Sequence, residues 1–166
     1  MAANGIERFA IHKGNKEALL NVSLIDKRNI KSKTKLTIMS RKSKGINAER
    51  EIIHSFWKMP GWTACRVAGS GSMKYPAPDV IAGNATRKLA IECKSTKSKY
   101  QYFEKEEIKQ LLQYAEMFGA EPWIAIRFDR NKFYFLRPKD LKETEKRYVA
   151  DLDLSKDKGF LFEHII

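Results

Sequence analysis

The fold depends on two short apolar runs, PDVIAG at residues 78–83 and LAIECK at residues 89–94. Both runs are apolar without a break in the middle, a pattern typical of strands that are buried on both faces. The segment between them starts at Asn84, directly after Gly83, and both residues favour a tight reversal of the chain. The stretch therefore predicts a β-hairpin.

The predicted hairpin gathers charged residues at one end. If Gly83 pairs with Lys88 across the loop, Asp79 falls directly opposite Glu92, and Lys94 shares a strand face with Glu92. Opposed Cβ atoms lie about 4.5–5.5 Å apart, so the two carboxylates repel each other unless something neutralises them. A divalent cation between them would do so and would make a site for phosphate chemistry. Taken singly, these residues are typical of a turn and of a solvated strand, but charges at the end of buried strands favour the functional interpretation.

Composition indicates a basic protein with one compact domain. The chain has 166 residues, of which 43% are apolar, with a formal net charge of +12 and a pI near 9.7. Such a charge favours a nucleic acid or an anionic membrane surface as partner. No apolar run approaches the roughly 18 residues that span a bilayer, and the N-terminus has no segment like a signal peptide. We therefore expect a cytoplasmic, nucleoid-associated protein with no membrane segment, in which Cys65 and Cys93 are reduced, core-filling thiols.

Residues 1–38 differ in character from the rest of the chain. They contain eight Lys and Arg against three Asp and Glu, and they carry no recognisable motif. Met39, followed by Ser40, Arg41 and Lys42, is suitable as an initiator methionine. We expect residues 1–38 to be a basic, loosely ordered extension, either native or from a misplaced start codon, and residues 39–166 to be the functional domain.

A first helix is predicted over about residues 43–59. Glu49 lies three residues before the apolar Ile52, so it belongs to the buried stripe of this helix. An inward carboxylate in the first turn either interacts with the helix dipole or is a third acidic group directed at the end of the hairpin. A strand at residues 62–67 follows, and then a Gly- and Ser-rich loop at residues 68–75, which either follows a phosphate backbone or only connects two strands.

A second helix is predicted to begin near Glu104 and to be closed by Gly119. Its first turn is acidic. We interpret Glu104, Glu106 and Glu107 as residues that favour the helix dipole and solubility rather than as metal ligands.

Two further strands are predicted at residues 122–128 and 132–137. The order helix, three strands, helix, two strands gives an α/β fold in which helices flank a mixed β-sheet. The pattern weakens after Pro138, and residues 159–166 are apolar enough to pack on the domain or on a second subunit.

Four short motifs follow one another along the chain. They are Gly45-x-x-Ala48-Glu49-Arg50-Glu51, Arg66-Val67-Ala68-Gly69-Ser70-Gly71, Pro78-Asp79-Val80-Ile81-Ala82-Gly83-Asn84 and Ile91-Glu92-Cys93-Lys94. Together they resemble the archaeal Holliday junction resolvase family, with weaker similarity in Phe118-Gly119-Ala120 and in residues 148–151. The resemblance covers about residues 41–155. That family belongs to the restriction-endonuclease-like nucleases, marked by an Asp on one strand and a Glu-x-Lys on the next, so the resemblance implies a restriction-endonuclease-like core and a nuclease domain at residues 39–166.

The resemblance also implies an active site. It implies Mg²⁺, with Mn²⁺ as an alternative, held by Glu49, Asp79 and Glu92. Lys94 would stabilise the transition state or orient the attacking water, and Ser70 would be either catalytic or DNA-positioning. Phosphodiester hydrolysis suits this set, because a hard cation with oxygen ligands polarises the phosphate and acidifies a water molecule.

The activity implied by the resemblance is the resolution of four-way (Holliday) DNA junctions in recombination and repair. Cutting a junction in two strands implies a two-fold homodimer and a continuous basic face on branched double-stranded DNA. The residues expected on that face are Arg41, Lys42, Lys44, Arg50, Arg66 and Lys97. The dimer interface is expected in the C-terminal half, at Phe118, Phe133, Phe135, Leu136 and residues 160–162.

Two other functions stay open at this point. One is another nuclease of the same fold that acts on other DNA structures, which the catalytic residues do not distinguish. The other is a non-catalytic basic DNA-binding module, against which the intact set of three carboxylates and Lys94 argues.

Overall fold

The computed structural model describes residues 41–69 and 75–166, with side chains from residue 45 onward. The chain divides into two units, Met1–Met39 and Ser40–Ile166, and all described residues belong to the second. The expected extension at residues 1–38 and the position of Ser70 therefore lie outside the described residues. None of the helices in the described part is long and apolar enough to cross a membrane.

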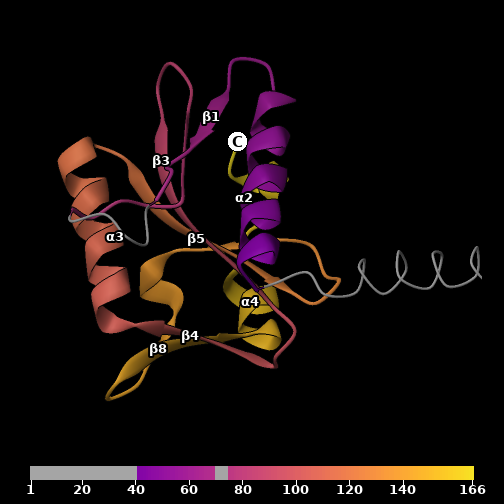
Figure 1. Cartoon of the computed structure of the whole chain (residues 1–166), viewed down its shortest axis with the longest axis vertical. Coiled ribbons are helices and arrows are strands. Elements are labelled where there is room, and N and C mark those ends of the chain that lie inside the picture. Colours follow the sequence, from indigo (N-terminus) through magenta and orange to yellow (C-terminus); the bar gives the residue numbers. More distant parts are fainter. Residues whose placement is uncertain (1–40, 70–74) are drawn as a thin grey trace, which may run out of the picture. The chain divides into compact units, whose positions relative to one another are not determined.

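The second unit has the α/β architecture that the sequence predicts. Its helices are α2 (Arg41–Trp57), α3 (Lys105–Phe118) and α4 (Leu152–Lys158). Its strands are β1 (Thr63–Arg66), β2 (Val80–Gly83), β3 (Lys88–Thr96), β4 (Tyr100–Glu104), β5 (Glu121–Phe128), β6 (Tyr134–Leu136), β7 (Lys142–Glu143) and β8 (Arg147–Asp151). Within the described residues these strands form a mixed sheet in the order β1-β2-β3-β5-β6 and a smaller sheet in the order β4-β8-β7 (Figure 1).

The predicted hairpin is the antiparallel pair β2–β3, in which Gly83 lies opposite Lys88 as expected. Asn84 shapes the loop, because its Oδ1 accepts hydrogen bonds from the backbone N–H groups of Thr86 at 2.9 Å and Arg87 at 2.7 Å. Glycine is needed at position 83, since a Cβ there would lie 2.9 Å from the carbonyl oxygen of Arg87. The loop chemistry therefore fixes the register of the two strands.

Helices α2 and α3 pack on opposite faces of the large sheet (Figure 1). Side chains alternate along β3, so that Leu89 and Ile91 enter the core cluster that contains apolar residues of α2. Ala90 enters the other cluster, which contains the apolar residues of α3. The same alternation directs Glu92 and Lys94 to the α3 face of the sheet.

The crossover between the parallel strands β3 and β5 contains β4 and α3. Helix α3 ends where the sequence predicts, because Gly119 has a φ of +66°, which a glycine adopts without strain. The backbone N–H of Gly119 donates to the carbonyl of Glu116 at 3.2 Å, and that of Ala120 donates to Ala115 at 2.8 Å. The crossover places α3 directly over the end of β3.

Three features differ from the sequence predictions. The small sheet was not predicted, because β4 and β8 are distant in the sequence and each has little buried apolar surface. Cys65 is exposed rather than core-filling, since it lies on edge strand β1 and points away from the face on which Ala64 packs. Phe135 and Leu136, expected near a dimer interface, are fully buried in the two core clusters.

Candidate active site

Asp79 and Glu92 meet at the end of the β2–β3 hairpin. The ladder ends at the pair Val80–Ile91, and Asp79 and Glu92 are the next residue on each side of it. Oδ2 of Asp79 accepts a hydrogen bond from the backbone N–H of Cys93 at 2.9 Å, which anchors this carboxylate against β3. The two carboxylates therefore lie together at the end of the hairpin.

The two carboxylates line a depression of about 200 Å³. Its other lining residues are Ala77, Pro78, Lys94, Glu107, Gln110 and Leu111. The hairpin and the segment before β2 supply one side of the depression, and the first turns of α3 supply the other.

Lys94 lies between two carboxylates in this depression. Its Nζ donates to Oε1 of Glu92 at 2.8 Å and also donates to Oε1 of Glu107. The three side chains are mostly buried, with 27% of Lys94 and 13% of Glu92 exposed. Burial favours a lower pKa for Lys94, but Glu92 and Glu107 outweigh it and raise the pKa above its ordinary value. Lys94 is therefore a permanent ammonium group at neutral pH.

Glu92 is a carboxylate in an unfavourable environment. Its burial, together with the neighbouring charge of Asp79, raises its pKa from 4.5 to about 8, although Lys94 acts in the opposite direction. With Glu92 protonated, the carboxylates of Asp79 and Glu107 against one ammonium leave a formal charge of −1, and loss of the Glu92 proton brings it to −2. The depression therefore has more negative charge than its own residues neutralise.

Glu49 lies near the same hairpin end, since its charge, like those of Asp79 and Glu92, acts to raise the pKa of Cys93. It is buried on α2, as its place on the apolar stripe predicts, and it forms an ion pair with Arg66 of β1. It does not line the depression that contains Asp79 and Glu92. In the part of the chain that the structure describes, no three His, Cys, Asp or Glu side chains are grouped so that they could hold a metal ion.

The expected DNA-binding residues are only partly described. Arg50 and Lys97 are exposed, and the Arg66 side chain is 38% exposed while it pairs with Glu49. Three further side chains lie outside the described residues, namely those of Arg41, Lys42 and Lys44. The role of these six residues in DNA binding stays a prediction.

Glu107 is the site residue that sequence reasoning missed. Its place in an acidic first helical turn is typical of a dipole-stabilising residue, and Glu106 beside it has the same local sequence context. Only the crossover from β3 to α3 brings Glu107 to Lys94, so no local sequence signal could have identified it.

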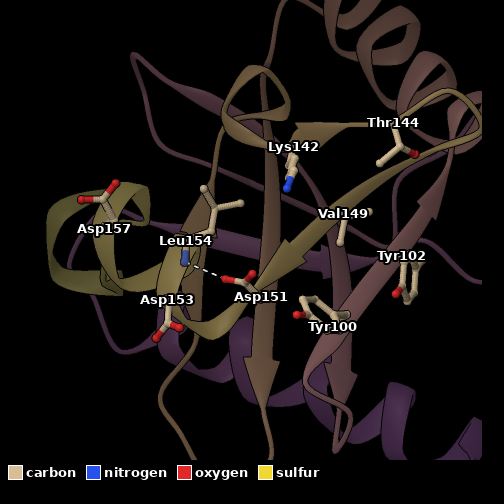
Figure 2. A pocket seen from close by; sticks show the side chains of 9 residues that line it. All are labelled: Tyr100, Tyr102, Lys142, Thr144, Val149, Asp151, Asp153, Leu154 and Asp157. Atoms are coloured by element: carbon tan, nitrogen blue, oxygen red, sulfur yellow. Dashed lines mark hydrogen bonds between the residues drawn. The ribbon is translucent and has the colours of Figure 1, made fainter.

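A larger groove of about 690 Å³ lies elsewhere, on the small sheet and α4. Figure 2 shows Tyr100 and Tyr102 of β4 on one side of it and Asp153 and Asp157 of α4 on the other. Asp151 caps α4 by accepting a hydrogen bond from the backbone N–H of Leu154 at 2.8 Å. None of the predicted catalytic or metal-binding residues lines this groove, so its size does not make it the active site.

Comparison with known proteins identifies the group to which this architecture is related. The family model "Archaeal holliday junction resolvase (hjc)" matches residues 40–166. The chain is 42% identical over 110 residues to crossover junction endodeoxyribonuclease Hjc of Archaeoglobus fulgidus. The aligned region covers 66% of this chain and 80% of the relative. It is 34% identical over 131 residues to the protein of the same name from Sulfolobus acidocaldarius, covering 77% of this chain and 90% of the relative.

A solved structure agrees with these relatives. The crystal structure of Archaeoglobus fulgidus Hjc, described as a Holliday junction resolvase from an archaeal hyperthermophile, matches with a TM-score of 0.67 at 35% sequence identity. The match covers 73% of this chain and 98% of that chain. The restriction-endonuclease-like fold expected from the sequence is thereby confirmed.

Proposed function

This chain belongs to the archaeal Holliday junction resolvase family, and we propose that it is a structure-selective endonuclease that cuts four-way DNA junctions by phosphodiester hydrolysis. The observation that supports this function most is the meeting of Asp79 and Glu92 beside the ammonium of Lys94. The formal charge of +12 suits a polyanionic substrate and association with nucleoid DNA.

We assign the binding of a divalent cation, Mg²⁺ or alternatively Mn²⁺, to Asp79 and Glu92. Their chemistry fits this ion, because Mg²⁺ is usually held by one or two protein carboxylates together with waters and substrate phosphates. A charge of +2 would also offset the formal charge of −2 that the depression carries once Glu92 releases its proton. When bound, such an ion polarises a phosphate oxygen and acidifies a water molecule.

The remaining residues have separate roles in this proposal. Lys94, held as an ammonium beside Glu92, stabilises negative charge that develops on the phosphate. Glu49 is proposed as the third ligand, and its ion pair with Arg66 is made through Oε2 alone, one of its two carboxylate oxygens. Ser70 is proposed to position DNA or to act in catalysis.

We further propose that the active form is a homodimer. One site cuts one strand, whereas resolving a junction into two duplexes requires cuts in two strands of the same polarity. A two-fold assembly supplies two sites at a fixed separation. The branched DNA would then contact basic surface on both subunits, through phosphates more than through bases.

Substitution of these two carboxylates tests the assignment. We expect Asp79→Asn and Glu92→Gln each to lower junction cleavage at least about 100-fold, because removing one ligand or charge stabiliser typically costs several kcal/mol of barrier. Junction affinity in gel-shift assays should stay within about threefold, because binding depends on phosphate contacts. The matched control is Glu145→Gln, which removes an exposed carboxylate in the turn before β8.

The result separates the three functions that the sequence left open. Cleavage by either variant at near the native rate would remove the proposed site. Equal cleavage of linear duplex and four-way junctions of matched sequence would favour a different nuclease of the same fold. Junction binding by the native chain with no cleavage in Mg²⁺ or Mn²⁺ would favour the non-catalytic module.

A further inference from the structure

We propose that Glu107 is the positioning residue that holds the Lys94 ammonium in the active-site depression. This inference rests on the proposed function, in which Lys94 stabilises charge on the scissile phosphate. Glu107 comes from α3 and Lys94 from β3, so their contact joins the helix to the catalytic hairpin.

The contacts of Lys94 show why a second carboxylate is useful there. Its Nζ is bound by Glu92 and by Glu107 at the same time. Glu92 is also the proposed ligand of a divalent cation. That cation and the Lys94 ammonium are both positive, so they repel each other when both are bound to the same carboxylate. With Glu92 as the only partner, Lys94 would be displaced whenever that carboxylate served the cation. Glu107 supplies a partner that is not assigned to the cation.

The place of Glu107 on α3 supports this role. It lines the depression together with Gln110 and Leu111, so one face of α3 is directed at the hairpin end. The Leu111 side chain is buried, which fixes the helix against the sheet. Glu107 is therefore presented from a rigid element, and the Lys94 ammonium is restrained from both sides.

The competing explanation is that Glu107 only stabilises the start of α3. Glu106 provides the matched control, because it lies in the same first turn and has the same charge. Glu106 is largely exposed, and its ion pair at 3.7 Å is with Lys109 rather than with Lys94. Any effect through the helix dipole should therefore be shared by Glu106→Gln, whereas an effect through Lys94 should not.

The experiment measures single-turnover cleavage and junction affinity for the native chain, Glu107→Gln, Glu107→Asp and Glu106→Gln. We expect Glu107→Gln to lower the cleavage rate about 10- to 100-fold, the range caused by small misplacements of catalytic groups. Junction Kd should stay within about twofold, because Glu107 is not a phosphate contact. Glu107→Asp should recover part of the rate, and Glu106→Gln should match the native chain.

A second measurement does not depend on activity. In metal-free protein without DNA, the rate at which an acylating reagent modifies Lys94 is measured by mass spectrometry for the native chain and both Gln variants. Loss of one of its two partners should expose the amine, so Glu107→Gln should be modified several-fold faster and Glu106→Gln at the native rate.

The two measurements together decide the inference. Native-rate cleavage and unchanged Lys94 modification in Glu107→Gln would overturn it, as would equal losses in the Glu106 and Glu107 variants. If the native chain cuts no junction, the proposed function fails, and the modification rate alone still tests whether Glu107 holds Lys94.

Discussion

The carboxylate of Glu92 lies on β3 between Asp79 and Lys94, where burial disfavours its charged form. Its pKa rises from 4.5 to about 8, so between these values the folded chain holds a proton that the unfolded chain has released. A folded state that binds more protons loses stability as pH rises. The free energy of unfolding should therefore decrease between about pH 4.5 and pH 8 because of this group.

The variant Glu92→Gln cannot titrate and isolates this effect. We expect the difference in unfolding free energy, native minus Glu92→Gln, to fall by on the order of 3–4 kcal/mol from pH 5 to pH 8. This difference is measured by urea unfolding of both proteins in the presence of a chelator at pH 5, 6.5 and 8. A difference that stays constant with pH, or that rises, would contradict the assigned shift.

At the scale of residues, the sequence predicts what depends on local pairing. The meeting of Asp79 and Glu92 at the hairpin end follows from a four-residue loop and a period of two, both of which can be counted along the chain. The burial of Glu49 follows from helical spacing, but its ion pair with Arg66 depends on how α2 packs beside β1. The contact of Glu107 with Lys94 depends on the crossover from β3 to α3, so it could not be predicted by counting residues along the chain.

At the scale of elements, α3 carries both the Glu107 contact and the C-terminal glycine that ends it. Gly119 has a φ of +66°, and Lys88 donates to the carbonyl of the preceding Phe118 at 3.2 Å. A β-branched residue at position 119 would be strained in this conformation, whereas Asn tolerates it. We expect Gly119→Val to lower the free energy of unfolding by about 1–2 kcal/mol and Gly119→Asn by clearly less.

The free energy of unfolding of both Gly119 variants is measured by chemical denaturation, followed by the circular dichroism signal of the helices. Equal stability of the Val and Asn variants would show that backbone strain at this position does not limit the fold. Cleavage by the folded fraction should be preserved, since Gly119 lies at the opposite end of α3 from Glu107.

The elements that the sequence predicted are those with strong local periodicity. The two long helices, the hairpin and the pair β5–β6 have continuous apolar runs or regular stripes. Strand β4 has only Phe103 fully buried, and its partner Arg147–Asp151 lies more than forty residues away in the sequence. Such a strand is stabilised by pairing that no local pattern encodes, so the small sheet could be found only in three dimensions.

At the scale of the molecule, the proposed dimer needs an apolar surface that the fold of one chain leaves exposed. Phe135 and Leu136 cannot contribute, because both are in the core. The C-terminal end of α3 can, since Met117 is 81% exposed and Phe118 is 42% exposed. The Phe118 ring also packs against that of Tyr114, with ring centroids 5.5 Å apart. Exposed aromatic and Met side chains of this kind are enriched at protein–protein interfaces.

The double variant Met117→Glu with Phe118→Glu tests this surface. Placing two negative charges on each subunit of a two-fold interface repels the partner, so we expect a monomer at micromolar concentration by sedimentation. The monomer should bind junctions more weakly and should nick single strands instead of making paired cuts. The parallel variant is Phe160→Glu on the tail, where the sequence also predicts the interface; it replaces a 42% exposed aromatic ring and should likewise give monomers that fail to make paired cuts. Dissociation by Phe160→Glu but not by the double variant would restrict the interface to the tail, and a native monomer that makes paired cuts would contradict the dimer itself.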